Sequence, residues 1–270
     1  MFYFVGGVAH NAVGTSPAQK INNMEGFRMT ELRNDLMVED MRKKMGDSIG
    51  IDDKFETGCQ ACDGYCKKSR VTIIMTPYDI YRASKELNMK VPDFINKYCR
   101  ISIGFESKLP VVTLNRGAKG KCILLRNGVC ITEKDKPLSC ALFPLEMFKD
   151  DKKKTTTFFV NNVNGHGEPV TYTVRQRLDV KKIDPNDSFY SLWGELLTAA
   201  SPLRQEMLEY VGFDRTIQAE NQMIIHLMYG AYDTDKDFLT QFIKNSEVLI
   251  ENLNKMLGVC RMLNVRKDEY

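Results

Sequence analysis

The chain has 270 residues, of which 43% are hydrophobic and 27% charged, a composition typical of a folded globular protein rather than a disordered one. Its 38 basic and 35 acidic residues give a net charge of +3, which is too balanced to favour nucleic acid as a partner. No apolar run approaches the roughly 20 residues that cross a bilayer, and no basic region precedes the apolar N-terminus, so we expect a cytoplasmic protein with no membrane partner.

The first expected elements alternate between helix and strand. Residues 1–28 are rich in Gly, Asn and Ser and are expected to be irregular. Apolar spacing predicts a helix over Thr30–Met45, with Thr30 as its N-cap and Gly46 at its end. A β-branched run predicts a strand at Val71–Met75, after which Thr76 and Pro77 carry the signature of a helix start.

A hairpin is the strongest local signal in the middle of the chain. The sequence predicts a short helix over Val91–Cys99 and a strand over Leu109–Leu114. Cys122–Leu125 and Val129–Thr132 then flank an Asn-Gly pair, which is typical of a tight hairpin turn. Such a hairpin would bring Cys122 and Cys130 near one another.

The last third of the chain is expected to be helical. Two more strands are predicted at Thr155–Asn161 and Val170–Arg175. Three helices follow, with glycines near their expected ends at Gly212, Gly230 and Gly258; they span Ser188–Tyr210, Asp214–Tyr229 and Lys236–Leu257.

Six of the eight cysteines lie in two short blocks. The first block is Cys59-x2-Cys62-x3-Cys66, and the second contains Cys122, Cys130 and Cys140. In a reducing compartment, clustered cysteines bind metal or do redox chemistry more often than they form disulfides. Thiolates select zinc or iron–sulfur clusters, so we expect these six cysteines to hold a [4Fe–4S] cluster, which is favoured, or zinc. Three thiolates would leave one iron open to a substrate, whereas four would give a closed site.

Other candidate groups are weaker. Cys99 and Cys260 are expected to be small buried hydrophobic residues. His166 lies between glycines and is read as an exposed loop residue that could still reach a metal, while His10 has no informative context. His226 lies among apolar residues and is expected in the core. One helical turn separates Asp79 from Arg82, so these two either pair with each other or clamp the first cysteine block.

The ordered set of these motifs resembles the YkgJ-like cysteine-cluster family, described as a zinc- or iron-chelating domain. The resemblance covers about residues 55–178, and its thiols map to the six cysteines of the two blocks. Its parts are the first cysteine block, Thr76-Pro-Tyr-Asp79-x2-Arg82, Phe94-x3-Tyr98, Cys122-Ile-Leu, Gly128-Val-Cys130-Ile, Pro137-Leu-Ser-Cys140-x2-Phe143-Pro144, Asn164-Gly-His-Gly167 and Tyr172-Thr-Val-Arg175.

Two departures from the family pattern concern ligands. The family usually has a cysteine where this chain has Lys67, and often another where it has Asn161-Asn162. We hypothesise that those two thiolates belong to one site that is altered or absent here. Six thiolates remain, enough for one four-ligand cluster or a shared two-metal site, and Asn161, Asn162 or His166 could replace a lost ligand.

The sequence therefore predicts an α+β fold: a small cysteine-rich metal-binding core of short strands and helices, followed by an all-helical C-terminal part. The expected domains are an N-terminal extension with one helix (1–54), the cysteine-cluster domain (55–185) and the helical part (186–270). Three functions stay open. The first is a metalloprotein supporting a redox or protein- or peptide-modifying reaction, and the second is an interaction module with structural zinc. The third is an enzyme similar to the flagellin lysine N-methylases, which some family members resemble; it would use S-adenosylmethionine.

Overall fold

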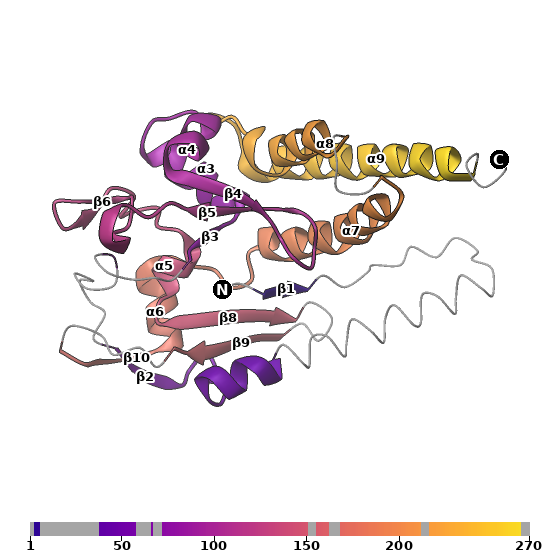
Figure 1. Cartoon of the computed structure of the whole chain (residues 1–270). Helices are drawn as coiled ribbons and strands as arrows, with labels where there is room; N and C mark the ends of the chain where they lie inside the picture. Colours follow the sequence, from indigo (N-terminus) through magenta and orange to yellow (C-terminus); the bar gives the residue numbers. More distant parts are fainter. Residues whose placement is uncertain are drawn as a thin grey trace. The chain divides into compact units, whose positions relative to one another are not determined.

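The computed structural model of the chain describes residues 3–5, 38–57, 66, 72–150, 155–161, 168–211 and 216–265 (Figure 1). Contacts between residues divide the chain into two compact units. The first unit consists of residues 1–61 and 142–198, and the second of residues 62–141 and 199–270. Helices and strands are mixed and the C-terminal region is helical, which confirms the α+β class. The linear division at residues 54 and 185 stays a prediction.

A three-stranded sheet forms the centre of the first unit. Strand β8 (Leu145–Asp150) lies between β1 (Tyr3–Val5), which is parallel to it, and β9 (Thr155–Val160), which is antiparallel. The sequence predicted β9 but neither β8 nor a strand within residues 1–28. The helical residues 38–45 contribute Met41, which packs in a small core with Phe148 and Phe159.

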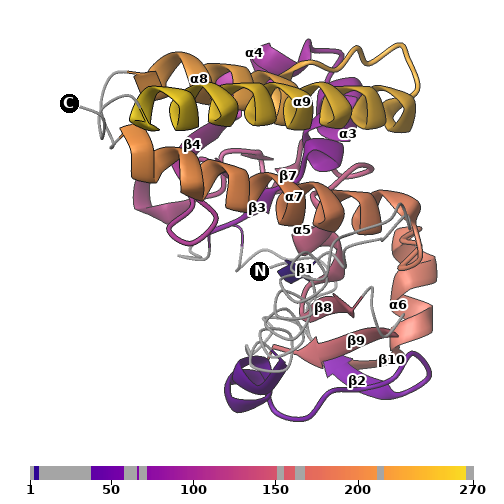
Figure 2. The same ribbon diagram turned by 90° about the vertical axis from the view of Figure 1, so that its right-hand side faces the viewer.

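The second pair of strands in this unit ends in a helix that the sequence did not predict. Strand β2 (Lys54–Thr57) pairs antiparallel with β10 (Val170–Thr173), and helix α6 (Val174–Lys181) follows directly (Figure 2). The expected strand over Val170–Arg175 is therefore wrong in its last two residues. Thr173 and Gln176 form a capping box, each side chain accepting from the other's backbone N–H, and this local exchange starts the helix.

An antiparallel sheet of order β3-β5-β4 lies in the second unit. The predicted strands are present as β3 (Ile74–Met75) and β5 (Pro110–Leu114), whereas β4 (Cys99–Ile103) was not expected. The predicted helix is present as α4 (Val91–Tyr98), and Cys99 begins β4 instead of ending that helix. Phe94 and Ile95 on α4 are buried.

Helix α3 (Pro77–Glu86) begins where the sequence predicts. The Thr76 hydroxyl accepts from the Asp79 N–H at 3.1 Å, and an Asp79 carboxylate oxygen accepts from the Thr76 N–H at 3.0 Å. Pro77 occupies the first helical position, where no N–H is needed. The chain leaves the helix through Asn88, which has a positive φ of 50°.

The predicted hairpin is confirmed, with shorter strands. Strand β6 (Leu125–Arg126) pairs antiparallel with β7 (Val129–Cys130). Asn127 and Gly128 both have positive φ angles, of 48° and 81°. This is the turn that an Asn-Gly pair favours between twisted strands.

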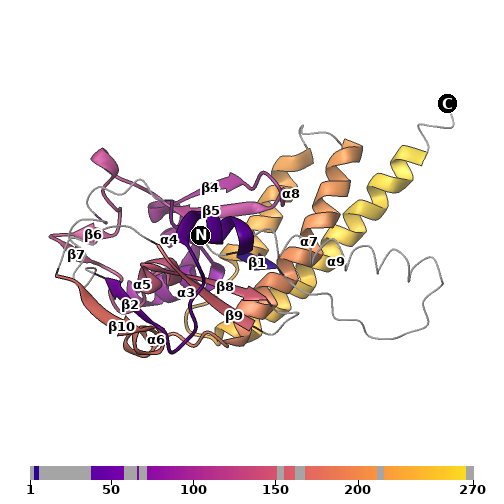
Figure 3. The same ribbon diagram turned by 90° about the horizontal axis from the view of Figure 1, so that it is seen from below.

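The described residues of the C-terminal region form three helices, as predicted. They are α7 (Ser188–Val211), α8 (Thr216–Ile225), extended by a π-helical turn η2 (His226–Gly230), and α9 (Phe238–Val265). Residues 188–198 of α7 belong to the first unit and the rest to the second, which also contains α8 and α9 (Figure 3). Gly258, expected near a helix end, lies inside α9, which continues to Val265. Within the described ranges, no helix is long and apolar enough to span a membrane.

An aromatic cluster joins α3 to the start of α9 in the second unit. The Phe238 ring lies 4.8 Å from the Tyr78 ring and 5.1 Å from the rings of Tyr81 and Tyr232, centroid to centroid. The Tyr81 hydroxyl donates to the Lys236 carbonyl oxygen at 2.7 Å. These contacts fix α3 from its apolar side.

Candidate metal centre

The two cysteine blocks meet at one backbone hydrogen bond. The N–H of Cys122 donates to the carbonyl oxygen of Cys66 at 2.7 Å. Cys122 also forms an isolated antiparallel bridge with Arg116, so it is held on two sides by main-chain pairing. The last cysteine of the first block is thereby fixed beside the first cysteine of the second block.

The hairpin brings Cys130 to the same region. Cys130 pairs with Leu125 across the two strands, and the Leu125 N–H donates to the Cys122 carbonyl oxygen at 3.1 Å. The Cys130 sulfur lies 3.4 Å from the hydroxyl oxygen of Thr132, a residue that is fully buried. The proximity of Cys122 and Cys130 that the Asn-Gly turn predicts is therefore present.

Cys140 comes from the short helix α5 (Leu138–Leu142). The Pro137 carbonyl oxygen accepts from the N–H groups of Cys140, at 2.8 Å, and Ala141, at 2.9 Å, and these bonds form the first turn. Cys140 keeps part of its surface exposed, although protein atoms crowd around its thiol.

The electrostatics of the site show that the three thiols share one environment. Burial is the main cause that raises the pKa of Cys140 to about 12, and the neighbouring Cys122, Cys130 and Asp79 raise it further. Burial also raises the pKa of Cys122, which Cys130 raises further. The Arg116 guanidinium acts in the opposite direction on both pKa values. Neither thiol ionises at neutral pH unless a cation lies against it, because a bound metal ion deprotonates a coordinating thiol.

Asp79 and Arg82 pair with each other, as the sequence allowed. Arg82 donates to the Asp79 carboxylate at 3.2 Å, and the Asp79 side chain is almost completely buried. The same carboxylate oxygen accepts from the Leu138 N–H at 2.8 Å, at the start of α5. The pair therefore holds the second cysteine block; the first block's Cys59 and Cys62 lie outside the described residues.

The described part of the chain contains an incomplete set of the predicted ligands. Cys66, Cys122, Cys130 and Cys140 all belong to the second unit, whereas Cys59, Cys62, His10, Asn162 and His166 fall outside the described residues. Among the residues that are described, no three His, Cys, Asp or Glu side chains are arranged to hold a metal ion by themselves. A complete site would thus need further ligands or movement of the thiols.

Two other candidates lie elsewhere. Asn161 belongs to the first unit, where its side-chain amide donates to Glu146 at 3.4 Å. His226 is exposed, so its predicted core position is wrong: the π-helical turn buries Met228 and Tyr229 and leaves the imidazole in solvent.

The two isolated cysteines differ in burial. Cys99 is buried, as predicted, and burial raises its pKa to about 12. Cys260 is only half-buried on α9, so its predicted full burial is wrong.

Two residues of the site carry no clear signal in the sequence. The Arg116 guanidinium lowers the pKa of Cys122 and of Cys140, and Thr132 contacts the Cys130 sulfur. Arg116 is placed beside Cys122 by the backbone bridge between the two residues. Thr132 could have been suspected from the strand predicted over Val129–Thr132, in which residues two apart share a side, although the strand of the structure ends at Cys130.

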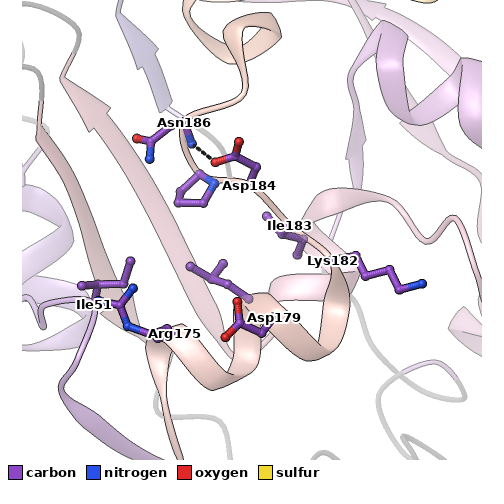
Figure 4. A pocket seen from close by; sticks show the side chains of 9 residues that line it. Ile51, Arg175, Asp179, Lys182, Ile183, Asp184 and Asn186 are labelled. Atoms are coloured by element: carbon purple, nitrogen blue, oxygen red, sulfur yellow. Dashed lines mark hydrogen bonds between the residues drawn. The ribbon is translucent and has the colours of Figure 1, made fainter.

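A separate pocket of about 480 Å³ lies in the first unit. Its wall includes Arg175 and Asp179 on α6 and the Asp184–Asn186 turn, in which the Asn186 N–H donates to the Asp184 carboxylate at 2.8 Å (Figure 4). Arg175 is already paired with Asp52 at 2.7 Å. The lining contains none of the predicted metal ligands, so this pocket is distinct from the candidate metal centre.

The donor set fits a soft metal. Cys122, Cys130 and Cys140 share one environment, form no disulfide, and supply sulfur, which binds zinc and iron–sulfur clusters in preference to magnesium or calcium. No family model matches the chain, and neither curated proteins nor solved structures gave a match.

Proposed function

We propose that this chain is a metalloprotein that binds an iron–sulfur cluster or zinc through cysteine thiolates. The ligands are drawn from Cys59, Cys62, Cys66, Cys122, Cys130 and Cys140. The observation that carries the proposal is the 2.7 Å hydrogen bond from the Cys122 N–H to the Cys66 carbonyl oxygen, which joins the two cysteine blocks. The shared environment of Cys122, Cys130 and Cys140 adds to this support.

The chemistry of the centre depends on how many thiolates it uses. A cluster held by three cysteines has one iron open to a small molecule or a protein substrate, and such a centre supports a redox or protein- or peptide-modifying reaction. A four-thiolate zinc site is closed and stabilises the fold. Either centre needs reduced thiols, so we place the protein in the cytoplasm.

The first test is the composition of anaerobically purified protein. We expect a visible absorption spectrum with near-stoichiometric iron and sulfide for a cluster, or a colourless protein with one or two zinc ions per chain. Protein without stoichiometric iron or zinc, even after reconstitution with each, would contradict the proposed centre.

The lysine methylase-like function and the structural-zinc interaction module stay predictions. Specific binding of S-adenosylmethionine, measured by calorimetry, separates the methylase from the other two. Bound zinc without iron or S-adenosylmethionine binding would favour the interaction module, whose partner would then be a protein.

A further inference from the structure

One side of helix α3 carries three charged residues in register. Asp79, Arg82 and Glu86 follow one another at three- and four-residue spacing, which places them on the same side of a helix. The opposite side carries Tyr81, which packs against Phe238. Helix α3 therefore has an apolar anchor on one side and a charged row on the other.

Glu86 holds the N-terminal part of residues 134–138, a segment without regular secondary structure up to α5. One carboxylate oxygen accepts from the Lys134 N–H at 3.2 Å and the other from the Asp135 N–H at 2.9 Å. A carboxylate that receives two successive backbone N–H groups fixes both the position and the direction of the chain there, and such charge-assisted bonds are stronger than neutral ones.

Arg82 holds the middle of the segment. It donates to the Lys136 carbonyl oxygen at 3.3 Å and lies 3.8 Å from the Asp135 carboxylate. Its guanidinium is itself held over the Tyr78 ring, 4.8 Å from the centroid, and by Asp79 at 3.2 Å. Because the cation is fixed on two sides, it can act as a rigid clamp.

Asp79 holds the end of the segment. Its buried carboxylate accepts from the Leu138 N–H at 2.8 Å, and this hydrogen bond spans 59 residues of the chain. Leu138 is the first residue of α5, which contains Cys140. The three side chains thus hold residues 134, 135, 136 and 138 against a single helix.

This segment joins two of the candidate ligands. It connects Cys130, at the end of the hairpin, to Cys140 on α5. Metal–ligand bond lengths at such a site lie within about 0.2 Å of their usual values, and loss of an outer-shell partner costs about 10–100-fold in metal affinity. A clamp on the chain between two ligands is therefore a device that can set the distance between their sulfur atoms.

We propose that Asp79, Arg82 and Glu86 are positioning residues that hold Cys140 in place for metal binding. The inference rests on the proposed function, since it assigns these residues to the same thiolate centre. If the inference is correct, loss of one of these side chains removes the Cys140 sulfur from the metal. A substitution that only destabilises α3 leaves that sulfur bound.

The test titrates the metal-free full-length protein with Co²⁺ alone and follows the thiolate-to-cobalt charge-transfer absorption, whose intensity rises with the number of bound thiolates. In Asp79→Ala we expect about 10–100-fold weaker binding and the reduced intensity of Cys140→Ser. The control is Ser84→Val, at a fully buried α3 residue whose hydroxyl donates to the Ile80 carbonyl oxygen of its own helix. The added methyl groups overpack this site, so the control should lower the melting temperature and keep the wild-type absorption.

Each outcome decides a different point. Wild-type protein without charge-transfer absorption would contradict the proposed thiolate centre, and the inference with it. If Asp79→Ala shows the same absorption and the same Co²⁺ affinity as the wild type, the inference alone is contradicted. If circular dichroism shows that Asp79→Ala does not fold, Glu86→Ala decides instead, because Glu86 is only half-buried and contacts the segment through two backbone N–H groups.

Discussion

The guanidinium of Arg204 on α7 forms an ion pair with the carboxylate of Glu220 on α8, and both side chains are almost completely buried, at 2% and 5% exposure. Arg204 also donates to the Asn221 side-chain oxygen at 3.0 Å. The Arg204 Nε and the Glu220 Oε1 have no hydrogen-bond partner among the described residues. Removing two charges from water costs free energy, and the hydrogen bonds of this pair offset that cost only in part, so the pair adds little net stability. Removing one partner is nevertheless costly, because it leaves the other charge buried and unpaired.

Removing one partner of this pair should destabilise the protein strongly. We expect Glu220→Leu to lower the free energy of unfolding by about 3–5 kcal/mol, because it leaves a buried guanidinium without its counter-charge. The double variant Arg204→Met/Glu220→Leu should recover most of that loss. Urea unfolding measures both, and equal destabilisation by the single and double variants would refute this account.

A surface pair between α9 and α7 provides the control. Arg261 contacts the Glu206 carboxylate through two nitrogens, each at 2.7 Å, but both residues are partly exposed. Exposed pairs contribute only about 0–1 kcal/mol. Glu206→Leu should therefore change the free energy of unfolding far less than Glu220→Leu does.

Two glycines should respond to alanine with opposite signs. Gly128 has a φ of 81° in the hairpin turn, so we expect Gly128→Ala to cost about 1–2 kcal/mol of stability. Gly258 lies inside α9 with open space where a Cβ would stand, so Gly258→Ala should add about 0.5–1 kcal/mol. Thermal unfolding of the two variants checks the prediction, which fails if Gly258→Ala is the more destabilising of the two.

Local chemistry explains which elements the sequence could predict. The start of α3 at Thr76 and the turn at Asn127 and Gly128 depend on residues within four positions, so their patterns are sufficient. The pairing of Asp79 with Arg82 is equally local. In contrast, β8 is stabilised by β1, far away in the chain, and no short-range pattern reports such a partner.

The misread elements have physical causes as well. A run of β-branched and aromatic residues from Val170 to Val174 favours a strand throughout, but the Thr173–Gln176 capping box ends the strand and starts α6. For the candidate site, spacing alone leads to the prediction of six cysteine ligands, which stays a prediction. It could not identify the bond between Asp79 and the Leu138 N–H, since the partner is a backbone group 59 residues away.

The buried thiol of Cys99 should make stability depend on pH in the alkaline range. Burial raises its pKa from 9.0 to about 12, so the folded protein keeps it neutral while the unfolded chain ionises. Its stabilising contribution is fully present below pH 9 and declines as the pH rises from 9 towards 12. The stability difference between wild type and Cys99→Ala should therefore be smaller at pH 10 than at pH 7 in urea unfolding. A difference independent of pH would contradict the assigned shift.

Serine substitutions should separate the candidate ligands from the remaining cysteines. A hydroxyl group is a harder and much weaker ligand for zinc or iron than a thiolate, so Cys62→Ser, Cys122→Ser and Cys140→Ser should each lower the metal content per chain. Cys260→Ser is the matched control, because this thiol is half-buried on α9, outside the two cysteine blocks. Elemental analysis of proteins purified in parallel measures the effect. Unchanged metal content in Cys62→Ser would remove the first block from the site, and unchanged content in Cys140→Ser would remove the reason for a clamp on residues 134–138.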